Sequence, residues 1–249
     1  KELLSAKTFS ILEGLTPLSL RVLNQASKAM TVAKGVEMMH AGDTPHDLYF
    51  IASGSIAITK EINGKINTLA KLEAGNIYGE YGALRGKTRF ASVHTAETST
   101  IIRVDLNAIQ QVIDVDGSFR DRIYAVIRQR LLNSFLFGHP VFQAISQVSR
   151  DKLSKALTIV EVARDEELFK VGDAAESYYM ILSGEAEVSV GPEKKKVVLE
   201  IRRDNNVLGE VRSDKGAKYA YTAQAANNLD LLLLDKKSMQ LIHLIEPEV

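Results

Sequence analysis

Hydrophobic and polar positions alternate along much of the chain with the two-residue period of strands that bury one face. An apolar segment at 48–51 leads through a Ser-Gly turn into such an alternating stretch at 56–58, and an Asn-Gly pair at 63–64, a strong hairpin signal, precedes the next strand-like segment. Two later runs, 101–104 and 231–234, are apolar almost throughout and predict strands buried on both faces. Many short strands separated by glycine turns indicate a jelly roll or a barrel.

A helical spacing replaces this pattern in several places. Thr16 and Ser146 each stand where an N-cap is expected, ahead of a short helical run. Asp105 is the expected cap of a helix over residues 106–113. A longer amphipathic helix follows, because apolar residues recur at every fourth position: Phe119, Ile123, Ile127, Leu131 and Phe135. The Gly-His-Pro sequence at 138–140 ends that helix.

The chain repeats itself at a constant offset of 130 residues, as between Gly42 and Gly172. Four short motifs recur at this distance: Ala41-Gly42-Asp43 with Val171-Gly172-Asp173, Ser53-Gly54 with Ser183-Gly184, Gly79-Glu80 with Gly209-Glu210, and Asp105 with Asp235. One long period indicates a duplicated domain, because solenoid repeats are only about 20–50 residues long. We therefore expect two domains, at 1–138 and 139–249, with the long helix at the end of the first.

The composition is that of a globular protein and narrows the choice of partners. The 31 Lys and Arg residues balance 31 Asp and Glu residues, so no general basic field attracts nucleic acid or an anionic membrane. The chain has no cysteine, which fits a cytoplasmic location, and no apolar run near the roughly 18 residues of a membrane span. Its five histidines lack a metal-binding spacing, and no nucleophile–base arrangement is visible, so we expect neither a metal site nor an enzyme.

The segment 79–92 carries the residues best suited to bind a ligand. Glu80 and Arg89 lie nine positions apart in it, among several glycines. A guanidinium can form a paired contact with phosphate, and a carboxylate can accept a hydrogen bond from a ribose hydroxyl. Glycine lets backbone N–H groups approach an anion closely. A surface ion pair is the simpler alternative for these two residues alone, but the second copy of the motif favours a ligand site.

A Gly-Asp turn, a strand ending in Ser-Gly, and Gly-Glu followed nine residues later by Arg-x-Ala resemble the cyclic nucleotide-binding domain family. The likeness covers nearly the whole chain, and the tandem arrangement is similar to the regulatory subunits of cAMP-dependent and cGMP-dependent protein kinases. The resemblance implies a mainly β fold with flanking α-helices, in which two tandem jelly-roll β-barrel domains are joined by the long helix. It also implies cAMP or cGMP as the ligand and no further cofactor.

The resemblance assigns roles to the residues of the first site. Glu80 would bind the ribose 2′-hydroxyl, and Arg89 would pair with the exocyclic oxygens of the cyclic phosphate. Gly79 would allow the strand to enter the site, and backbone N–H groups around other residues of the motif would complete it: Gly82, Ala83, Phe90 and Ala91. Most family members have a small or hydroxyl-bearing residue where Phe90 stands. The missing hydroxyl favours cAMP over cGMP.

The second site departs further from the family pattern. Gly209 and Glu210 are kept, but Tyr219 stands where the arginine is expected. A deletion of one residue would instead give that place to Lys218, with Tyr219 and Ala220 after it. A lysine has no fork for a phosphate, and an aspartate in the loop adds negative charge. We therefore expect the second site to bind cyclic nucleotide weakly or not at all.

Three functions remain open at this level. The first is a cyclic nucleotide receptor that changes conformation on binding and controls a partner, such as a kinase catalytic subunit or a fused domain. The second is a pseudo-receptor or scaffold that keeps the fold and binds no cyclic nucleotide, or binds another purine nucleoside or nucleotide. The third is a regulatory fragment of a larger enzyme or transcription factor. The side chain that caps the base is also open, with Tyr124, Phe135 and Val148 as candidates.

Overall fold

The chain folds into two compact units, Lys1–Ile127 and Arg128–Val249. The computed structural model describes residues 2–62, 64–86, 88–138, 142, 145–192, 195–203, 206–209 and 216–245. The division between the units falls inside helix α4 (Gly117–Gly138), ahead of the domain boundary expected at residue 138.

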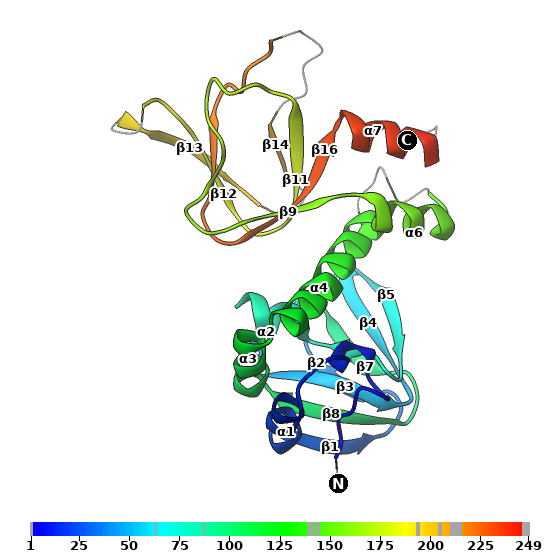
Figure 1. Cartoon of the computed structure of the whole chain (residues 1–249). Coiled ribbons are helices and arrows are strands. Elements are labelled where there is room, and N and C mark those ends of the chain that lie inside the picture. The colour runs from blue at the N-terminus through cyan, green and yellow to red at the C-terminus, as the bar shows by residue number, and fades with distance from the viewer. Residues whose placement is uncertain are drawn as a thin grey trace. The chain divides into compact units, whose positions relative to one another are not determined.

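The described part of unit 1 contains two antiparallel four-stranded sheets, with strand orders β1-β8-β3-β6 and β2-β7-β4-β5 (Figure 1). The strands are β1 (Ser27–Val32), β2 (Glu37–Met39), β3 (Asp47–Ser53), β4 (Ser55–Ile62), β5 (Lys65–Glu73), β6 (Ile77–Tyr78), β7 (Ser92–Thr95) and β8 (Ser99–Asp105). The helices are η1 (Ser10–Leu12), α1 (Pro17–Gln25), α2 (Glu80–Arg85), α3 (Leu106–Val115) and the first part of α4.

Unit 2 repeats this architecture, with strand orders β14-β11-β16-β9 and β10-β15-β12-β13 among its described residues. Its strands are β9 (Ile159–Val162), β10 (Glu167–Phe169), β11 (Ser177–Ser183), β12 (Ala186–Val190), β13 (Val197–Arg202), β14 (Val207–Gly209), β15 (Thr222–Ala225) and β16 (Leu229–Asp235). Helices α6 (Gln147–Ala156) and α7 (Lys236–Ile245) flank them. Each strand therefore has the same neighbours as its counterpart in unit 1. The fold class expected from the sequence, mainly β with flanking helices in two jelly-roll units, is confirmed.

Helix starts follow the local signals in the sequence. The Thr16 hydroxyl accepts a hydrogen bond from the Ser19 N–H at 3.1 Å and caps α1. Ser146 accepts in the same way from Ser149 at 3.1 Å and caps α6. The Asp105 carboxylate accepts from the Asn107 N–H at 2.8 Å and caps α3. All three caps were predicted, because a side-chain acceptor at this position satisfies an N–H group that the helix leaves without a partner.

The two helices after the strands are separated at Asp116. This residue has an extended backbone, with φ −124° and ψ 93°, and its carboxylate accepts hydrogen bonds from the Phe119 N–H at 2.9 Å and the Ser118 hydroxyl at 2.8 Å. A new helix therefore begins directly after α3. The five apolar residues predicted to form one face of this helix are all at most 6% exposed.

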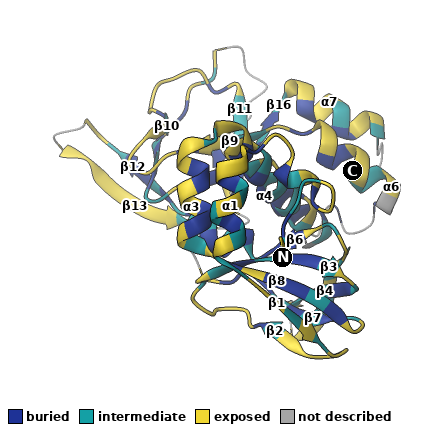
Figure 2. Cartoon of the chain, turned by 60° about the horizontal axis from the view of Figure 1, so that its bottom comes forward, coloured by how far each residue is buried: buried dark blue, intermediate teal, exposed yellow. Residues whose placement is uncertain are grey.

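Each unit has a core between its two sheets. Ile51, Ile56 and Ile101 of unit 1 are fully buried, and Figure 2 shows stretches in the colour of buried residues on β3 and β8. The apolar run at 231–234 is buried apart from the half-buried Leu233, whereas Arg103 makes one position of the 101–104 run exposed. The two apolar strands are thus buried nearly as predicted, except that β8 exposes one position, Arg103, to solvent.

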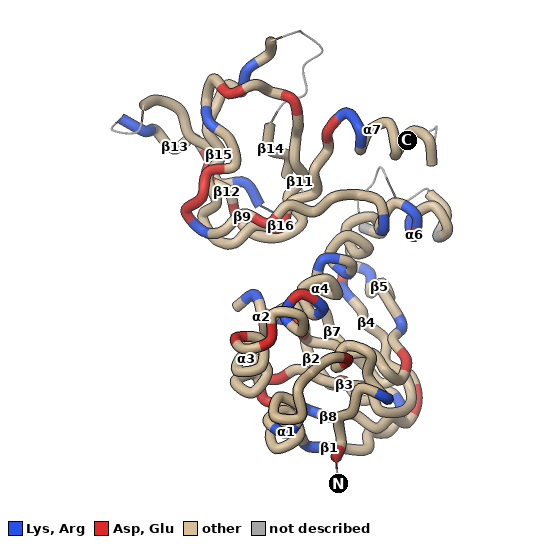
Figure 3. The backbone as a smooth tube through the Cα atoms, viewed as in Figure 1, with Lys and Arg blue, Asp and Glu red and all other residues tan. Residues whose placement is uncertain are grey.

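Charged residues of both signs are interspersed over each unit, in keeping with the overall balance of charge (Figure 3). Over the residues that the structure describes, no helix combines the length and the apolar character needed to cross a membrane.

Candidate ligand site and its second copy

Glycines delimit the segment that carries the candidate site of unit 1. Strand β6 ends at Tyr78, and Gly79 then adopts a left-handed conformation with φ 84° and leads into the short helix α2. Gly86, with φ 62°, ends this helix. Glu80, Gly82 and Ala83 are buried within it. The motif residues therefore follow a strand and a short helix, and Arg89 lies between this helix and β7, which begins at Ser92.

The Arg89 side chain is folded back onto the entrance of this segment. Its Nη1 donates to the Gly79 carbonyl at 2.6 Å, and its Nη2 donates to the Asp47 carbonyl on β3 at 2.8 Å. The residue is only 6% exposed. Each terminal nitrogen donates one of its hydrogens to a carbonyl, so the guanidinium fork retains further donors for an anion.

Close packing around Arg89 explains why residue 79 is a glycine. A Cβ atom on Gly79 would lie 2.8 Å from Arg89 Nη1 and 2.9 Å from Met39 Cε. Its positive φ adds backbone strain for any other residue. The glycine is therefore required both by conformation and by the approach of the guanidinium.

The charge of Arg89 is set by burial and by nearby acidic groups. Burial lowers the pKa of its guanidinium, and the carboxylates of Asp47, Glu80 and Asp43 oppose this effect. Because a guanidinium is a very strong base, the side chain remains a cation at neutral pH. Glu80 is 3% exposed and lies near enough to Arg89 to act on its pKa. A cation and a carboxylate are thus present together in one buried segment.

The backbone of Arg89 is held by the Gly-Asp turn between β2 and β3. The Gly42 N–H donates to the Arg89 carbonyl at 2.8 Å, and the Arg89 N–H donates to the Asp43 carbonyl at 2.8 Å. The Ala41 N–H donates to the Ser92 hydroxyl at 3.0 Å. The sequence had indicated a simple turn here, but the turn also fixes the position of residue 89.

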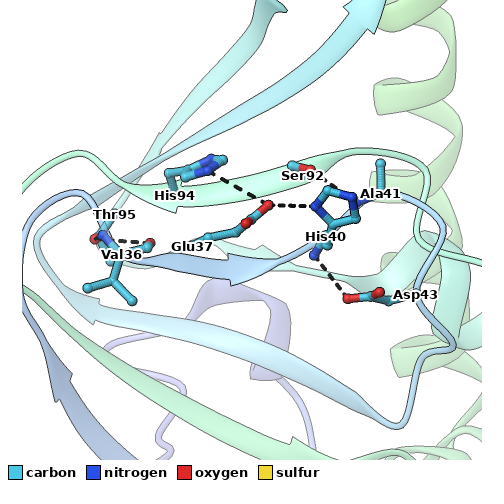
Figure 4. Close-up of polar contacts among 8 residues, drawn as sticks. All are labelled: Val36, Glu37, His40, Ala41, Asp43, Ser92, His94 and Thr95. Atoms are coloured by element: carbon cyan, nitrogen blue, oxygen red, sulfur yellow. Dashed lines mark hydrogen bonds and ion pairs between the residues drawn. The ribbon is translucent and has the colours of Figure 1, made fainter.

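A polar cluster on the surface supports the same turn (Figure 4). The Glu37 carboxylate lies 2.9 Å from His40 Nδ1 and 3.8 Å from His94 Nε2, and the His40 N–H donates to Asp43 Oδ2 at 3.2 Å. The hydrogen bond with Glu37 raises the pKa of His40, and the same bond lowers the pKa of Glu37. Across the described residues, no group of three His, Cys, Asp or Glu side chains is arranged to hold a metal ion.

Phe90 is packed between the helix and the sheet. Lys60 Nζ on β4 lies 3.4 Å from the centre of the Phe90 ring, and the Tyr81 ring of α2 meets it edge-on at 5.6 Å. Sequence reasoning had noted the missing hydroxyl at this position but not the contact with Lys60, which joins residues 30 positions apart, at 60 and 90. Ala91 beside it is 7% exposed.

Main-chain hydrogen bonds fix the correspondence between the two copies. The Gly172 N–H donates to the Tyr219 carbonyl at 2.9 Å, and the Tyr219 N–H donates to the Asp173 carbonyl at 2.9 Å. The Val171 N–H donates to Thr222 Oγ1 at 3.1 Å. These are the bonds of the first copy, each 130 residues later, and they give Tyr219 the place of Arg89. The one-residue deletion that would have given this place to Lys218 is therefore wrong.

The Tyr219 side chain also follows the course of the arginine. Its hydroxyl donates to the Ser177 carbonyl at 2.5 Å, the counterpart of the bond from Arg89 to Asp47. Lys218 instead corresponds to the residue before the arginine, forms a backbone bridge with Ala174, and is exposed. Gly209 keeps its left-handed backbone at φ 90°, and Ala220 is exposed, whereas Glu210 lies outside the described residues.

The family model described as "Cyclic nucleotide-binding domain" matches residues 29–116 and 159–243, more than half of the chain. The chain belongs to the cyclic nucleotide-binding domain family. Its two jelly-roll units are two domains of this family in tandem, an arrangement similar to the regulatory subunits of cAMP-dependent protein kinase.

The relatives of this chain include kinase regulatory subunits. It is 25% identical over 220 residues to the cAMP-dependent protein kinase regulatory subunit of Eremothecium gossypii, with 88% of this chain and 44% of that protein covered. It is 24% identical over 231 residues to the subunit of Hypocrea atroviridis, with 89% and 47% covered. The chain thus spans about half the length of the curated relatives it matches.

Two solved structures illustrate the range of similar proteins. The regulatory domain of Toxoplasma gondii PKA with cAMP is 18% identical, with a TM-score of 0.42 and coverage of 95% of this chain and 89% of that one. The regulatory subunit of a cAMP-independent protein kinase A from Trypanosoma brucei is 17% identical, with a TM-score of 0.39 and coverage of 94% and 83%. One protein is thus described with cAMP and the other as cAMP-independent.

Proposed function

We propose that this protein is a non-enzymatic cyclic nucleotide receptor whose first domain binds the ligand and controls a partner. In this proposal Arg89 holds the cyclic phosphate, Glu80 holds the ribose, and backbone groups of the motif complete the site. The observation that supports it most is the buried Arg89 guanidinium, which is fixed by two carbonyls and lies close to the Glu80 carboxylate. The ligand is cAMP rather than cGMP, because Phe90 offers no hydroxyl.

The route from the site to a partner runs through α2 and the first part of α4. Arg85 is the last residue of α2, and its guanidinium carbon lies 4.9 Å from the centre of the Tyr124 ring on α4. The same helix is tied to the N-terminal segment by a hydrogen bond from Arg122 Nε to the Ile11 carbonyl at 3.0 Å. A ligand that shifts α2 would therefore act on α4. A tenfold preference of the ligand for one arrangement shifts the equilibrium by about 1.4 kcal/mol.

The partner is a kinase catalytic subunit or an attached effector domain, and the proposal keeps the cytoplasmic location expected from the sequence. The second domain binds cyclic nucleotide weakly or not at all, since a neutral tyrosine stands in place of the arginine. The proposal keeps the domain limits at 1–138 and 139–249, which assign the full length of α4 to the first domain.

Calorimetric titration of the whole chain with cAMP and cGMP tests the function. We expect wild-type protein to bind cAMP and Arg89→Glu to lose binding, because the substitution places negative charge against the phosphate. Arg103→Glu is the matched control, because Arg103 is 49% exposed and extends from β8 outside the motif. Glu80→Gln should weaken binding about 10- to 100-fold, as expected for a hydrogen bond to a charged group. Normal cAMP binding by the Arg89→Glu protein would show that the site is elsewhere.

The alternative is a scaffold that binds no cyclic nucleotide or binds another purine nucleoside, and Tyr219 in the second domain supports it for that domain. A thermal-shift screen separates the two functions, because a ligand of the native state raises the melting temperature by mass action. No shift with cAMP or cGMP at ligand concentrations far above micromolar, together with a shift by a nucleoside, would replace the receptor function by this alternative.

A further inference from the structure

We propose that Phe169, Tyr219 and Tyr221 close the phosphate site of the second domain from within and exclude cyclic nucleotides from it. The inference rests on the proposed function of the first domain, whose corresponding residues are Met39, Arg89 and Ala91 at the 130-residue offset. It goes beyond a weak second site, because it names the side chains that bar the ligand and the contacts by which they do so.

Three aromatic rings pack together where the first domain has Met39, Arg89 and Ala91. The Phe169 and Tyr219 rings are stacked, with centres 3.8 Å apart and planes 18° from parallel. The Phe169 and Tyr221 rings lie 5.4 Å apart and are tilted by 59°. All three residues belong to the core of the second domain and are 5–8% exposed. Aromatic side chains therefore fill, in this domain, positions that in the first domain hold the arginine, a methionine and an alanine.

Polar groups around the rings are already paired with one another. The Tyr221 hydroxyl accepts hydrogen bonds from the Gly209 N–H at 2.6 Å and from Arg202 Nη1 at 3.0 Å. Arg202 also donates to the Val207 carbonyl at 2.6 Å and pairs with the Glu200 carboxylate at 2.7 Å. A phosphate entering here would have to displace the phenol oxygen from the backbone N–H and compete with a carboxylate for the guanidinium.

Tyr219 stands in the second domain where Arg89 stands in the first. It lacks the positive charge but keeps a hydrogen bond to the corresponding carbonyl, that of Ser177. Burial raises the pKa of the Tyr219 hydroxyl, so the side chain stays neutral at physiological pH. A buried phosphate without a paired cation is strongly disfavoured. The hydrogen bond from Tyr219 to Ser177 meanwhile joins the loop to β11 without any ligand. The second domain should therefore be closed in the absence of nucleotide and bind none when it is added.

The test restores the first-domain residues in the second domain of the full chain. Calorimetry with cAMP is carried out on wild type, on Arg89→Glu, and on Arg89→Glu combined with Phe169→Met, Tyr219→Arg and Tyr221→Ala. We expect one binding event for wild type, none for Arg89→Glu, and one for the combined variant. Retained binding by Arg89→Glu protein, or no binding by a folded combined variant, would overturn the inference.

The outcome for wild type separates this inference from the proposed function. If wild type binds no cAMP, the function of the first domain fails, while a gain of binding in the combined variant still supports the closure of the second. Two binding events for wild type, one lost on alteration of the first domain and the other on alteration of the second, would support the first site and refute the closure of the second.

A conservative variant covers the case in which the combined variant does not fold. Tyr219→Phe keeps the ring and removes the hydroxyl, and we expect about tenfold faster amide hydrogen exchange in residues 177–179 and 207–209, with no gain of cAMP binding. Tyr178→Phe is the control, because the Tyr178 hydroxyl contacts the Met239 sulfur on α7 instead of the site. Equal exchange in Tyr219→Phe and wild-type protein would refute the role of the hydroxyl in the closure.

Discussion

Arg89 should stabilise the first domain even when no ligand is bound. Its guanidinium donates to the carbonyls of Gly79 and Asp47, and hydrogen bonds from a charged group contribute about 1.5–3 kcal/mol each. Arg89→Ala removes both bonds and leaves two carbonyls without their partner, but it also removes the unfavourable burial of one charge. We therefore expect the local stability around the motif to fall by about 3 kcal/mol, which corresponds to roughly a hundredfold change in an equilibrium constant.

Hydrogen exchange measured by mass spectrometry can detect this change within one domain of the full chain. Peptides from β6, α2 and β7 of ligand-free Arg89→Ala protein should exchange up to about a hundredfold faster, while those of the second domain keep the wild-type rate. Arg103→Ala is the matched control, because Arg103 faces the same Asp47 at 3.6 Å but is 49% exposed, and surface pairs contribute at most about 1 kcal/mol. If Arg89→Ala and Arg103→Ala proteins exchange alike, the guanidinium does not hold the segment and the reasoning is refuted.

Three further predictions concern the surroundings of the arginine. Gly79→Ala should lower the melting temperature more than Gly86→Ala in a thermal scan, because both have positive φ but only a Cβ at 79 would lie under 3.0 Å from other atoms; equal effects would show that backbone strain alone matters. Glu37→Gln should return the pKa of His40 toward its ordinary 6.5 in an NMR titration, and an unchanged pKa would contradict the cause given for it. In the native protein the stabilisation by this pair should be complete between pH 4.5 and 6.5, fade as pH rises through the raised pKa of His40, and fade as pH falls through the lowered pKa of Glu37. Phe90→Thr should raise the affinity for cGMP relative to cAMP about five- to tenfold in calorimetry, through one new hydrogen bond, whereas Phe90→Val, without the hydroxyl, should not.

Local signals in the sequence predicted a large part of the fold. The caps Thr16, Asp105 and Ser146 each satisfy a nearby N–H group, and such short-range chemistry can be recognised without knowledge of the tertiary structure. The duplicated motifs gave the number of units because they recur at one offset. The break at Asp116 was also foreshadowed by the separate helical patterns on its two sides.

The sequence indicated Glu80 and Arg89 as candidate site residues, but it did not indicate all of the contacts that they make. Glu80 and Arg89 were identified by spacing, and the structure shows that burial and two carbonyls hold the guanidinium. The role of Asp47 could not be predicted, because it contributes a backbone carbonyl, which any residue type has. The contact between Lys60 on β4 and Phe90, which precedes β7, joins residues far apart in the sequence and leaves no local signal.

The position of Tyr219 shows why the alignment of Lys218 with Arg89 was wrong. A basic residue one position earlier offered a plausible match by chemical type, so Lys218 was favoured over the unbroken offset. Main-chain bonds decide the matter, because Gly172 and Asp173 hold the backbone of Tyr219 and not that of Lys218. The main-chain bonds to the turn thus decide which residue takes the place of the arginine, whatever its side chain.

The Gly-Asp turn therefore holds the backbone of the residue at this position whatever side chain that residue carries. In both domains it grips residue 89 or 219 through N–H and carbonyl groups alone, with bonds of 2.8–2.9 Å. An arginine and a tyrosine fit the same backbone position, and each reaches the facing strand with its own donor. After a duplication, a substitution at this position can change what a domain recognises while the main-chain hydrogen bonds to the turn are kept. The fold thus permits one copy to lose ligand binding by exchange of side chains, without loss of its architecture.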